Sequence, residues 1–288
     1  MFTGRLASSR SHLEAALALY DPISHRSLVH VAGFGPQVVS QAQLGIVLLC
    51  LGFSDQALAR SNVAIAEARR LAHPPSFAMS LSLATALLSL IGDDAALAER
   101  AGHLVAVATQ QGFPFFRAQG TIYQGWVRVK NGDVAEGISL LRSGSAAFRA
   151  PGTSVWMPYY IALGATAYEI AGQIERSLAH LDDALQMVER TGERWFAAEL
   201  NRHKGQLLLR QGHAEAAEDL YCKALSIARE QEAKLWELRA AASLARLRRD
   251  QGRPDEARDL LAPIYGWFSE GFDTPDLKEA KALLDELG

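Results

Sequence analysis

The feature that constrains this chain most is a glycine that returns every 40 residues. Six glycines share this phase along the 288 residues: Gly52, Gly92, Gly132, Gly172, Gly212 and Gly252. A fixed period of this length is typical of repeat proteins, in which each supersecondary unit packs against its neighbours. The sequence is therefore interpreted as a series of similar units before any single motif is considered.

Two columns of mostly small residues accompany the glycine. Seven positions before it stand Gly45, Thr85, Gly125, Ala165, Gly205 and Ala245. Five positions after it stand Ala57, Leu97, Gly137, Ser177, Ala217 and Ala257, of which only Leu97 is large. Small side chains let two helix backbones approach closely, so the two columns predict a helix crossing within each unit.

The residues between these columns have apolar positions at helical spacing, which predicts a helix A, a turn at the glycine and a helix B in each unit. Glycine suits the turn because it adopts a left-handed conformation without a Cβ penalty. Gly112, Gly152 and Gly192 follow three of the turn glycines by 20 residues and are expected to end helix B. The predicted fold class is all-α.

The period also predicts how the chain is organised. Residues 1–34 are expected to form a partial N-terminal repeat, made of a turn, a helix B and a long loop. Residues 35–272 then form six repeats, and residues 273–288 form a helix that caps the last one. Terminal repeats need such a cap because their outer face would otherwise be exposed.

The cap has its own sequence signals. Gly271 is expected to stop a helix, Thr274 to be an N-cap and Pro275 to occupy the first helical position. Pro263 falls inside the preceding helix, where a proline removes a hydrogen bond, so we expect a kink there.

The order small, glycine, small at positions −7, 0 and +5 resembles the tetratricopeptide repeat (TPR). That resemblance implies a right-handed α-solenoid of helix–turn–helix units, here with about 40 residues per repeat. In that family helix A forms most of the concave wall, where protein or peptide partners bind.

The sequence also resembles the C-terminal TPR region of bacterial multidomain signalling proteins with a STAND-type ATPase or an adenylate/guanylate cyclase-like domain. The similarity is carried by GFSDQALARS at 52–61, ATQQGFP at 108–114, VERTGERWFAAELNRHKGQLLL at 188–209 and LLAPIYGWFSEGFDTPDLKEAKALLDEL at 260–287. It implies the sensor or regulatory arm of such a system, because the chain holds no GxxxxGK[ST] nucleotide-binding motif and no cyclase domain.

Motifs for catalysis and metal binding are missing from the sequence. Neither G-x-S-x-G nor H-E-x-x-H occurs, and the eight histidines show no ligand spacing. We therefore predict no enzymatic activity, no catalytic residue, no metal and no cofactor. A helical enzyme with a site in the superhelix groove is kept as an alternative.

Composition limits the partners and the compartment. The formal net charge of −3 provides no basic field for nucleic acid or for an anionic membrane. Cys50 and Cys222 are too few for a disulfide scaffold, and both are interpreted as buried thiols in a reducing cytoplasm. The uncharged stretch 27–54 is interpreted as a buried helix rather than a membrane span, because glutamines and Pro36 interrupt its first half.

The binding surface is placed by the resemblance to TPR proteins, at fixed distances before each turn glycine. In the later repeats these positions are aromatic and charged, and they give Trp126, Lys130, Tyr159, Glu169, Glu199, Arg202, Gln206, Arg210, Arg239 and Arg246. Arginine beside aromatic residues suits peptide carboxylates or phosphates, which a guanidinium can bind through two hydrogen bonds. The other interpretations are that the arginines are solvated or ion-paired, and that the partial N-terminal repeat forms a homodimer.

Overall fold

The computed structural model describes all residues except Pro22, Ile23 and Arg26, and all regular elements in the described part are helices. They are α1 Leu6–Leu19, α2 Leu28–Ala32, α3 Pro36–Cys50, α4 Ser54–Leu71, α5 Pro74–Ile91, α6 Asp94–Gln110, α7 Pro114–Lys130, α8 Val134–Arg149, α9 Met157–Ile170, α10 Ile174–Thr191, α11 Ala197–Arg210, α12 Ala214–Glu230, α13 Lys234–Asp250, α14 Pro254–Tyr265 and α15 Pro275–Glu286.

Each of the six phased glycines lies in the turn between a helix A and a helix B, as the period predicts. Their φ angles range from +72° to +94°, in the left-handed region that favours glycine. At Gly132, the glycine N–H donates to the Val129 carbonyl and the Asp133 N–H donates to the Arg128 carbonyl, at 3.1 and 2.9 Å. This pair of bonds is a Schellman motif, which ends α7 and turns the chain into α8.

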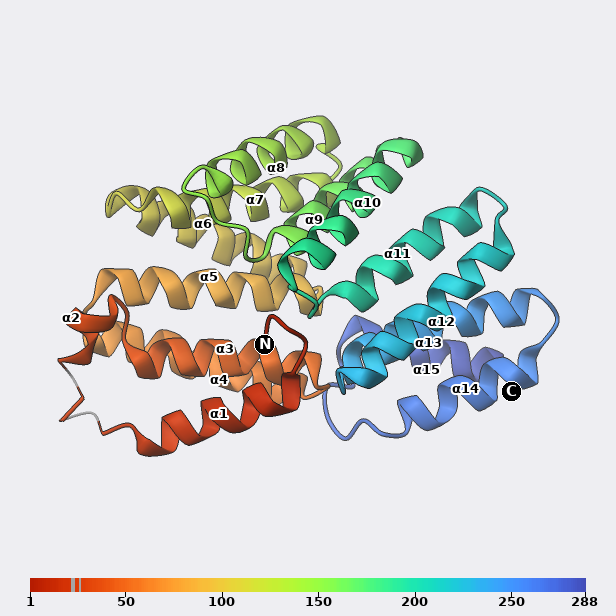
Figure 1. Ribbon diagram of the computed structural model, residues 1–288, viewed down its shortest axis with the longest axis horizontal. Coiled ribbons are helices and arrows are strands. Elements are labelled where there is room, and N and C mark those ends of the chain that lie inside the picture. The colour runs from red at the N-terminus through yellow and green to blue at the C-terminus, as the bar shows by residue number, and fades with distance from the viewer. Residues whose placement is uncertain (22–23, 26) are drawn as a thin grey trace. The chain divides into compact units, whose positions relative to one another are not determined.

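The small columns lie where helix A and helix B of one repeat cross. A Cβ atom on Gly125 would lie 2.8 Å from both the Gly137 carbonyl oxygen and the Leu141 amide nitrogen. In the next repeat the Ser177 hydroxyl donates to the Ala165 carbonyl across the same crossing, at 2.7 Å. Figure 1 shows the resulting hairpins as neighbouring helix pairs, for example α7 beside α8.

Helix B ends at a second left-handed position, 20 residues after the turn glycine. Gly112, Gly152 and Gly192 occupy it with φ of +68°, +84° and +72°. In two other repeats the same position is taken by Ala72 and Glu232, at φ of +51° and +57°. These two residues keep the backbone conformation of the repeat without being glycine.

Three local expectations differ from the structure. The long loop expected at the end of residues 1–34 contains the short helix α2, while Pro22, Ile23 and Arg26 of this stretch lie outside the described residues. Cys50 is buried but Cys222 is exposed, because it lies on the outer face of helix α12. Pro263 lies in the last turn of α14, which ends at Tyr265, so the proline precedes the helix end rather than interrupting a longer helix.

The C-terminal capping helix forms as α15, but two of the residues before it differ from the expectation. Gly271 has φ +77° but follows an irregular segment, not a helix. Thr274 is the residue before α15, and Pro275 is the first helical residue, as expected. The Thr274 hydroxyl donates to the Gly271 carbonyl at 2.7 Å instead of capping the helix.

The chain divides into two compact units, which are described separately. Unit 1 contains residues 1–6, 50–53 and 155–288, and therefore helices α9 to α15. Unit 2 contains residues 7–49 and 54–154. Among the described residues, one helix, Pro74–Ile91 in unit 2, is long and apolar enough to cross a membrane, but 72% of that window is buried, as in a core helix.

Candidate functional site

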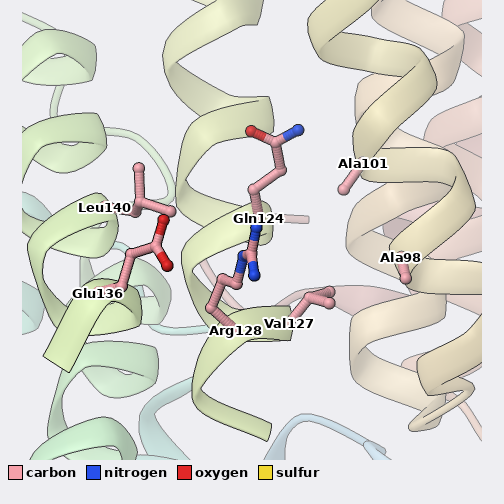
Figure 2. A pocket seen from close by; sticks show the side chains of 7 residues that line it. All are labelled: Ala98, Ala101, Gln124, Val127, Arg128, Glu136 and Leu140. Atoms are coloured by element: carbon pink, nitrogen blue, oxygen red, sulfur yellow. The ribbon is translucent and has the colours of Figure 1, made fainter. Parts of the chain in front are cut away.

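Unit 2 has a hollow of about 300 Å³ between helices α6, α7 and α8. Figure 2 shows its lining: Ala98, Ala101, Gln124, Val127, Arg128, Glu136 and Leu140. Two of the residues predicted to bind a partner, Trp126 and Lys130, also lie on α7 but do not line this hollow. The Lys130 ammonium lies 5.7 Å from the centre of the Trp126 ring and 2.7 Å from the Asp94 carboxylate. Lys130 therefore contacts Trp126 on its own helix and Asp94 on α6.

Unit 1 contains eight of the ten predicted residues, and six of these eight line two hollows that share Arg202. The first, of about 470 Å³, is lined by Thr166, Glu169, Ile170, Arg202, His203, Gln206 and Arg210. The second, of about 190 Å³, is lined by Arg202, Leu238, Arg239, Ala242, Ser243, Arg246, Asp276 and Glu279. We call the surface of these two hollows, together with Glu199, the charged wall; it is formed by α9, α11, α13 and α15.

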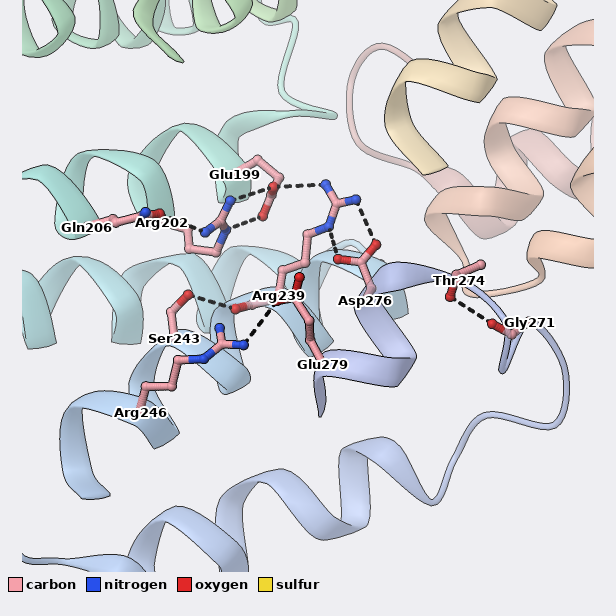
Figure 3. A network of polar contacts seen from close by, with 10 residues as sticks. All are labelled: Glu199, Arg202, Gln206, Arg239, Ser243, Arg246, Gly271, Thr274, Asp276 and Glu279. Carbon is pink, nitrogen blue, oxygen red and sulfur yellow. Dashed lines mark hydrogen bonds and ion pairs between the residues drawn. The ribbon is translucent and has the colours of Figure 1, made fainter. Parts of the chain in front are cut away.

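The centre of the charged wall is a chain of ion pairs, shown in Figure 3. The Arg202 guanidinium donates to both Glu199 carboxylate oxygens, at 2.8 and 3.1 Å. Arg239 donates to Glu199 at 3.1 Å and to both oxygens of Asp276 at 2.8 Å. Burial alone would raise the pKa of Glu199, but Arg202 and Arg239 outweigh it and hold this pKa below its usual value. Glu199 is therefore ionised, and it fixes two guanidinium groups in place.

A second cluster lies between α9 and α11. The Glu169 carboxylate is 2.6 Å from His203 Nε2 and 2.8 Å from Arg210 Nη1. Burial opposes ionisation of Glu169, yet His203 and Arg210 lower its pKa below the usual value. Arg210 keeps 54% of its side chain exposed, so it is the most accessible guanidinium of this hollow.

The charges of the wall balance. Its formal charges are the four guanidinium groups of Arg202, Arg210, Arg239 and Arg246 and the four carboxylates of Glu169, Glu199, Asp276 and Glu279. Arg246 pairs with Glu279 at 3.0 Å, so each of the four arginines has a carboxylate partner. The geometry therefore supports the interpretation of these arginines as ion-paired.

Two predicted residues are buried rather than accessible. Tyr159 is 2% exposed, and its ring centre lies 5.9 Å from those of Trp156 and Trp195 and 5.1 Å from that of Phe196. It belongs to an aromatic layer at the start of the A helices and not to the wall. Glu199, 4% exposed, acts on the wall only through the arginines that it holds.

Sequence reasoning missed the acidic residues of the capping helix. Glu279 lies 40 residues after Arg239, which itself lies 40 after Glu199, so continuing the repeat register by one period would have placed it on the wall. His203 was also missed, because its pairing with Glu169 joins two repeats and depends on the rotation of both helices. Within the described part of the chain, no group of three His, Cys, Asp or Glu side chains is placed to hold a metal ion.

Comparisons with known proteins place this geometry in context. No family model matches the chain. An uncharacterized protein of Rhizobium meliloti (strain 1021) is 29% identical over 250 residues, which are 85% of this chain and 24% of that protein. The chain therefore spans about a quarter of the length of this curated relative.

Solved structures share the fold at low sequence identity. NprR in complex with its cognate peptide NprX has a TM-score of 0.62 at 14% identity, covering 96% of this chain and 81% of that one. A Rap protein complexed with Competence and Sporulation Factor has a TM-score of 0.61 at 12% identity, covering 88% and 74%. BtubC from P. vanneervenii has 0.51 at 15%, covering 80% and 87%. The chain is an all-α, TPR-like solenoid.

Proposed function

We propose that the chain is a non-enzymatic binding module that holds a protein segment or peptide on the charged wall of unit 1. The observation that carries this proposal is the pair of adjoining hollows that share Arg202 and are lined by paired arginines and carboxylates. Two proteins with a similar fold were solved with a bound partner: NprR with its cognate peptide NprX, and a Rap protein with Competence and Sporulation Factor.

The charge balance of the wall decides between classes of ligand. A nucleic-acid backbone needs several unpaired cations, because its affinity comes from phosphate neutralisation. On the wall, four arginines face four carboxylates, so little net field remains to attract a polyanion. A polypeptide offers carbonyl acceptors, amide donors and side chains of both signs, and it therefore fits this surface better.

The titratable groups of the wall support binding rather than catalysis. A general base needs a pKa near neutrality and a free lone pair aimed at the substrate. Both Glu169 and Glu199 have lowered pKa values because they are ion-paired. Their carboxylates orient neighbouring arginines and would be weak bases.

The biological setting is the finer part of the proposal. The resemblance to the C-terminal TPR region of STAND-type ATPase and cyclase-like proteins supports a sensor or regulatory arm of a cytoplasmic signalling system. The short span of this chain on its Rhizobium relative, 24%, is compatible with such an arm of a larger protein. Partner binding would then be passed on to the catalytic domains of that system.

The experiment is a peptide selection followed by a matched pair of variants. A phage-displayed library of random peptides is selected on the wild-type chain, and each enriched peptide is then measured by fluorescence polarisation. We expect the double variant Gln206→Ala/Arg210→Ala to weaken binding by about tenfold or more, as loss of an interface arginine does. Arg190→Ala, which removes an exposed arginine of α10 in the same unit, should leave binding unchanged. Equal affinities for all three proteins would remove the charged wall as the site.

A second copy of the chain is the alternative partner, and one observation favours it. Near the N-terminus, in unit 2, Leu19 and Val31 are 78% and 85% exposed. Large apolar side chains at such exposure are common in contact surfaces when they lie close together. Light scattering of the wild type and of Leu19→Ser/Val31→Ser tests this, since a monomer at all concentrations in both proteins would exclude a homodimer through these residues.

A further inference from the structure

Two turns from the N-terminal part of the chain belong to unit 1, although the helices that follow them belong to unit 2. They are the turn of residues 1–4 and the turn of residues 50–53. Both contain a left-handed glycine, Gly4 at φ +82° and Gly52 at φ +94°. Gly52 is one of the phased turn glycines, and Gly4 lies in the turn expected at the start of the partial N-terminal repeat.

The first turn is held by backbone and ring contacts. The Phe2 carbonyl accepts from the Arg194 and Trp195 amides, at 2.7 and 3.2 Å. The Phe2 ring stands edge-on to Trp156, with centres 6.1 Å apart. A Cβ atom on Gly4 would lie 2.7 Å from the Gln231 amide nitrogen Nε2, so no other residue fits without moving that side chain. The contact therefore depends on two features of the turn: the Phe2 carbonyl that accepts hydrogen bonds, and the absence of a Cβ atom at Gly4.

The second turn is held by aromatic rings. A Cβ atom on Gly52 would lie 2.8 Å from the Trp267 ring and 3.0 Å from both Lys234 Cβ and the Phe268 ring. The adjacent Phe53 ring lies 5.5 Å from Trp267, centre to centre, and the Lys234 ammonium lies 5.5 Å from the same indole. Trp267 thus contacts the turn, its neighbouring ring and a cation.

Other turn glycines of the same shape have no such neighbours. At Gly132, Gly172, Gly212 and Gly252, an added Cβ would meet nothing within 4 Å. At these positions glycine is favoured only by the left-handed turn that ends the helix, and not by a close neighbour. The close approach at Gly4 and Gly52 is therefore a property of the surface that they contact and does not follow from the repeat itself.

We propose that unit 1 carries a binding site for left-handed glycine turns of helical hairpins, occupied in cis by residues 1–4 and 50–53. The site consists of Trp156, the amides of Arg194 and Trp195, Gln231, Lys234, Trp267 and Phe268, and we call it the turn-binding site. Such a turn exposes carbonyl oxygens and lacks a Cβ, so amide donors and flat rings can approach its backbone. The ligand class is a hairpin turn with glycine at the left-handed position.

Cys50 reports whether the second turn is docked. Its side chain is fully buried, and burial raises the pKa of the thiol to about 12. A buried thiol of this kind reacts slowly because the thiolate is the nucleophile. Cys222 is exposed, so a Cys222→Ser background leaves Cys50 as the single thiol to be followed.

The first experiment compares two substitutions with the same backbone strain. In the Cys222→Ser background, Gly52→Val and Gly212→Val each place a β-branched residue at a positive φ, +94° and +87°, but only the first meets neighbouring side chains. We expect Gly52→Val to speed alkylation of Cys50 by iodoacetamide by about tenfold or more, and Gly212→Val to change it by less than about twofold. Equal rates in the two variants would overturn the proposal.

The second experiment asks whether the site accepts a turn in trans. Gly4→Val should release the first turn and speed hydrogen exchange of the Arg194 and Trp195 amides by about tenfold or more, whereas Gly172→Val should not. Added in the millimolar range, the peptide MFTGRL should restore protection in Gly4→Val, and the control peptide MFTVRL should not. Failure of both peptides to protect these amides would show that the turns are packed there without forming a site for a free ligand, and would refute the proposal.

Discussion

Replacing Gly125 by alanine tests the helix crossing on which the repeat depends. Gly125 lies inside α7, where alanine is favoured over glycine by about 1 kcal/mol. Against this gain, the new Cβ would lie 2.8 Å from two backbone atoms of α8, the Gly137 carbonyl oxygen and the Leu141 nitrogen. Backbone atoms cannot rotate away as a side chain can, so the two helices must separate.

The magnitude follows from these two opposing terms. Inserting a methyl group into a tightly packed contact costs about 1–3 kcal/mol. After the helix-propensity gain of about 1 kcal/mol, we expect Gly125→Ala to destabilise the chain by up to about 2 kcal/mol. At about 2–4 °C per kcal/mol, this lowers the Tm by several degrees.

Gly102 provides the matched control. It also lies inside a helix of unit 2, α6, but a Cβ atom there would meet nothing within 4 Å. Gly102→Ala should therefore stabilise the chain by about 0.5–1 kcal/mol. Urea unfolding followed by circular dichroism measures both variants. If both substitutions raise the midpoint, the crossing is looser than the 2.8 Å distances indicate and the assignment of the small columns is wrong.

Three further predictions concern single residues. The pKa of Glu169 is lowered in the folded chain, so its contribution to stability is present above its unfolded pKa and is lost as the pH falls through its folded pKa. The difference in unfolding free energy between the wild type and Glu169→Gln, measured by urea titration, should therefore shrink from pH 7 towards acid. Ala72→Gly and Glu232→Gly relieve about 1–2 kcal/mol of left-handed strain and cost about 0.5–1 kcal/mol of backbone entropy, so each should leave the urea midpoint unchanged or higher, and a clear drop would contradict this. Arg239→Met leaves the buried Glu199 with one partner and should cost about 3 kcal/mol, measured as a fall in Tm that Arg190→Met does not reproduce.

The repeat architecture was predictable because it depends on short-range rules. A left-handed turn favours glycine because other residues are strained there, and a close helix crossing requires small residues. The roles of Gly132 and of the Gly125–Gly137 pair could therefore be predicted from their spacing alone. The helix ends followed from the same glycines. The structure differs from these expectations at Pro263, which lies just before an irregular segment, and at α2, which lies in an expected loop.

The candidate site was less predictable because it depends on helix rotation and on contacts between repeats. Counting back from the turn glycine placed Tyr159, Glu199 and Arg239 in one column, yet the first two are buried and the third is shared between two carboxylates. Position 13 before the glycine lies near the start of a short helix A in α9 and α11, and in α9 it belongs to the aromatic layer. The partner of Arg239, Asp276, lies three residues before the register position that Glu279 occupies, so extending the period by one repeat does not reach it.

The pairing of every arginine on the charged wall has a consequence for how a partner would be chosen. A ligand carboxylate that reaches Arg210 or Arg246 displaces an internal carboxylate that already holds the same guanidinium. Its gain is only the difference between two similar bonds, so opposite charge adds little to affinity, and dissolved salt should perturb the complex little. The charged wall would then discriminate by how many internal bonds a ligand can replace at once. A ligand with correctly spaced polar groups should bind better than a ligand that is only acidic.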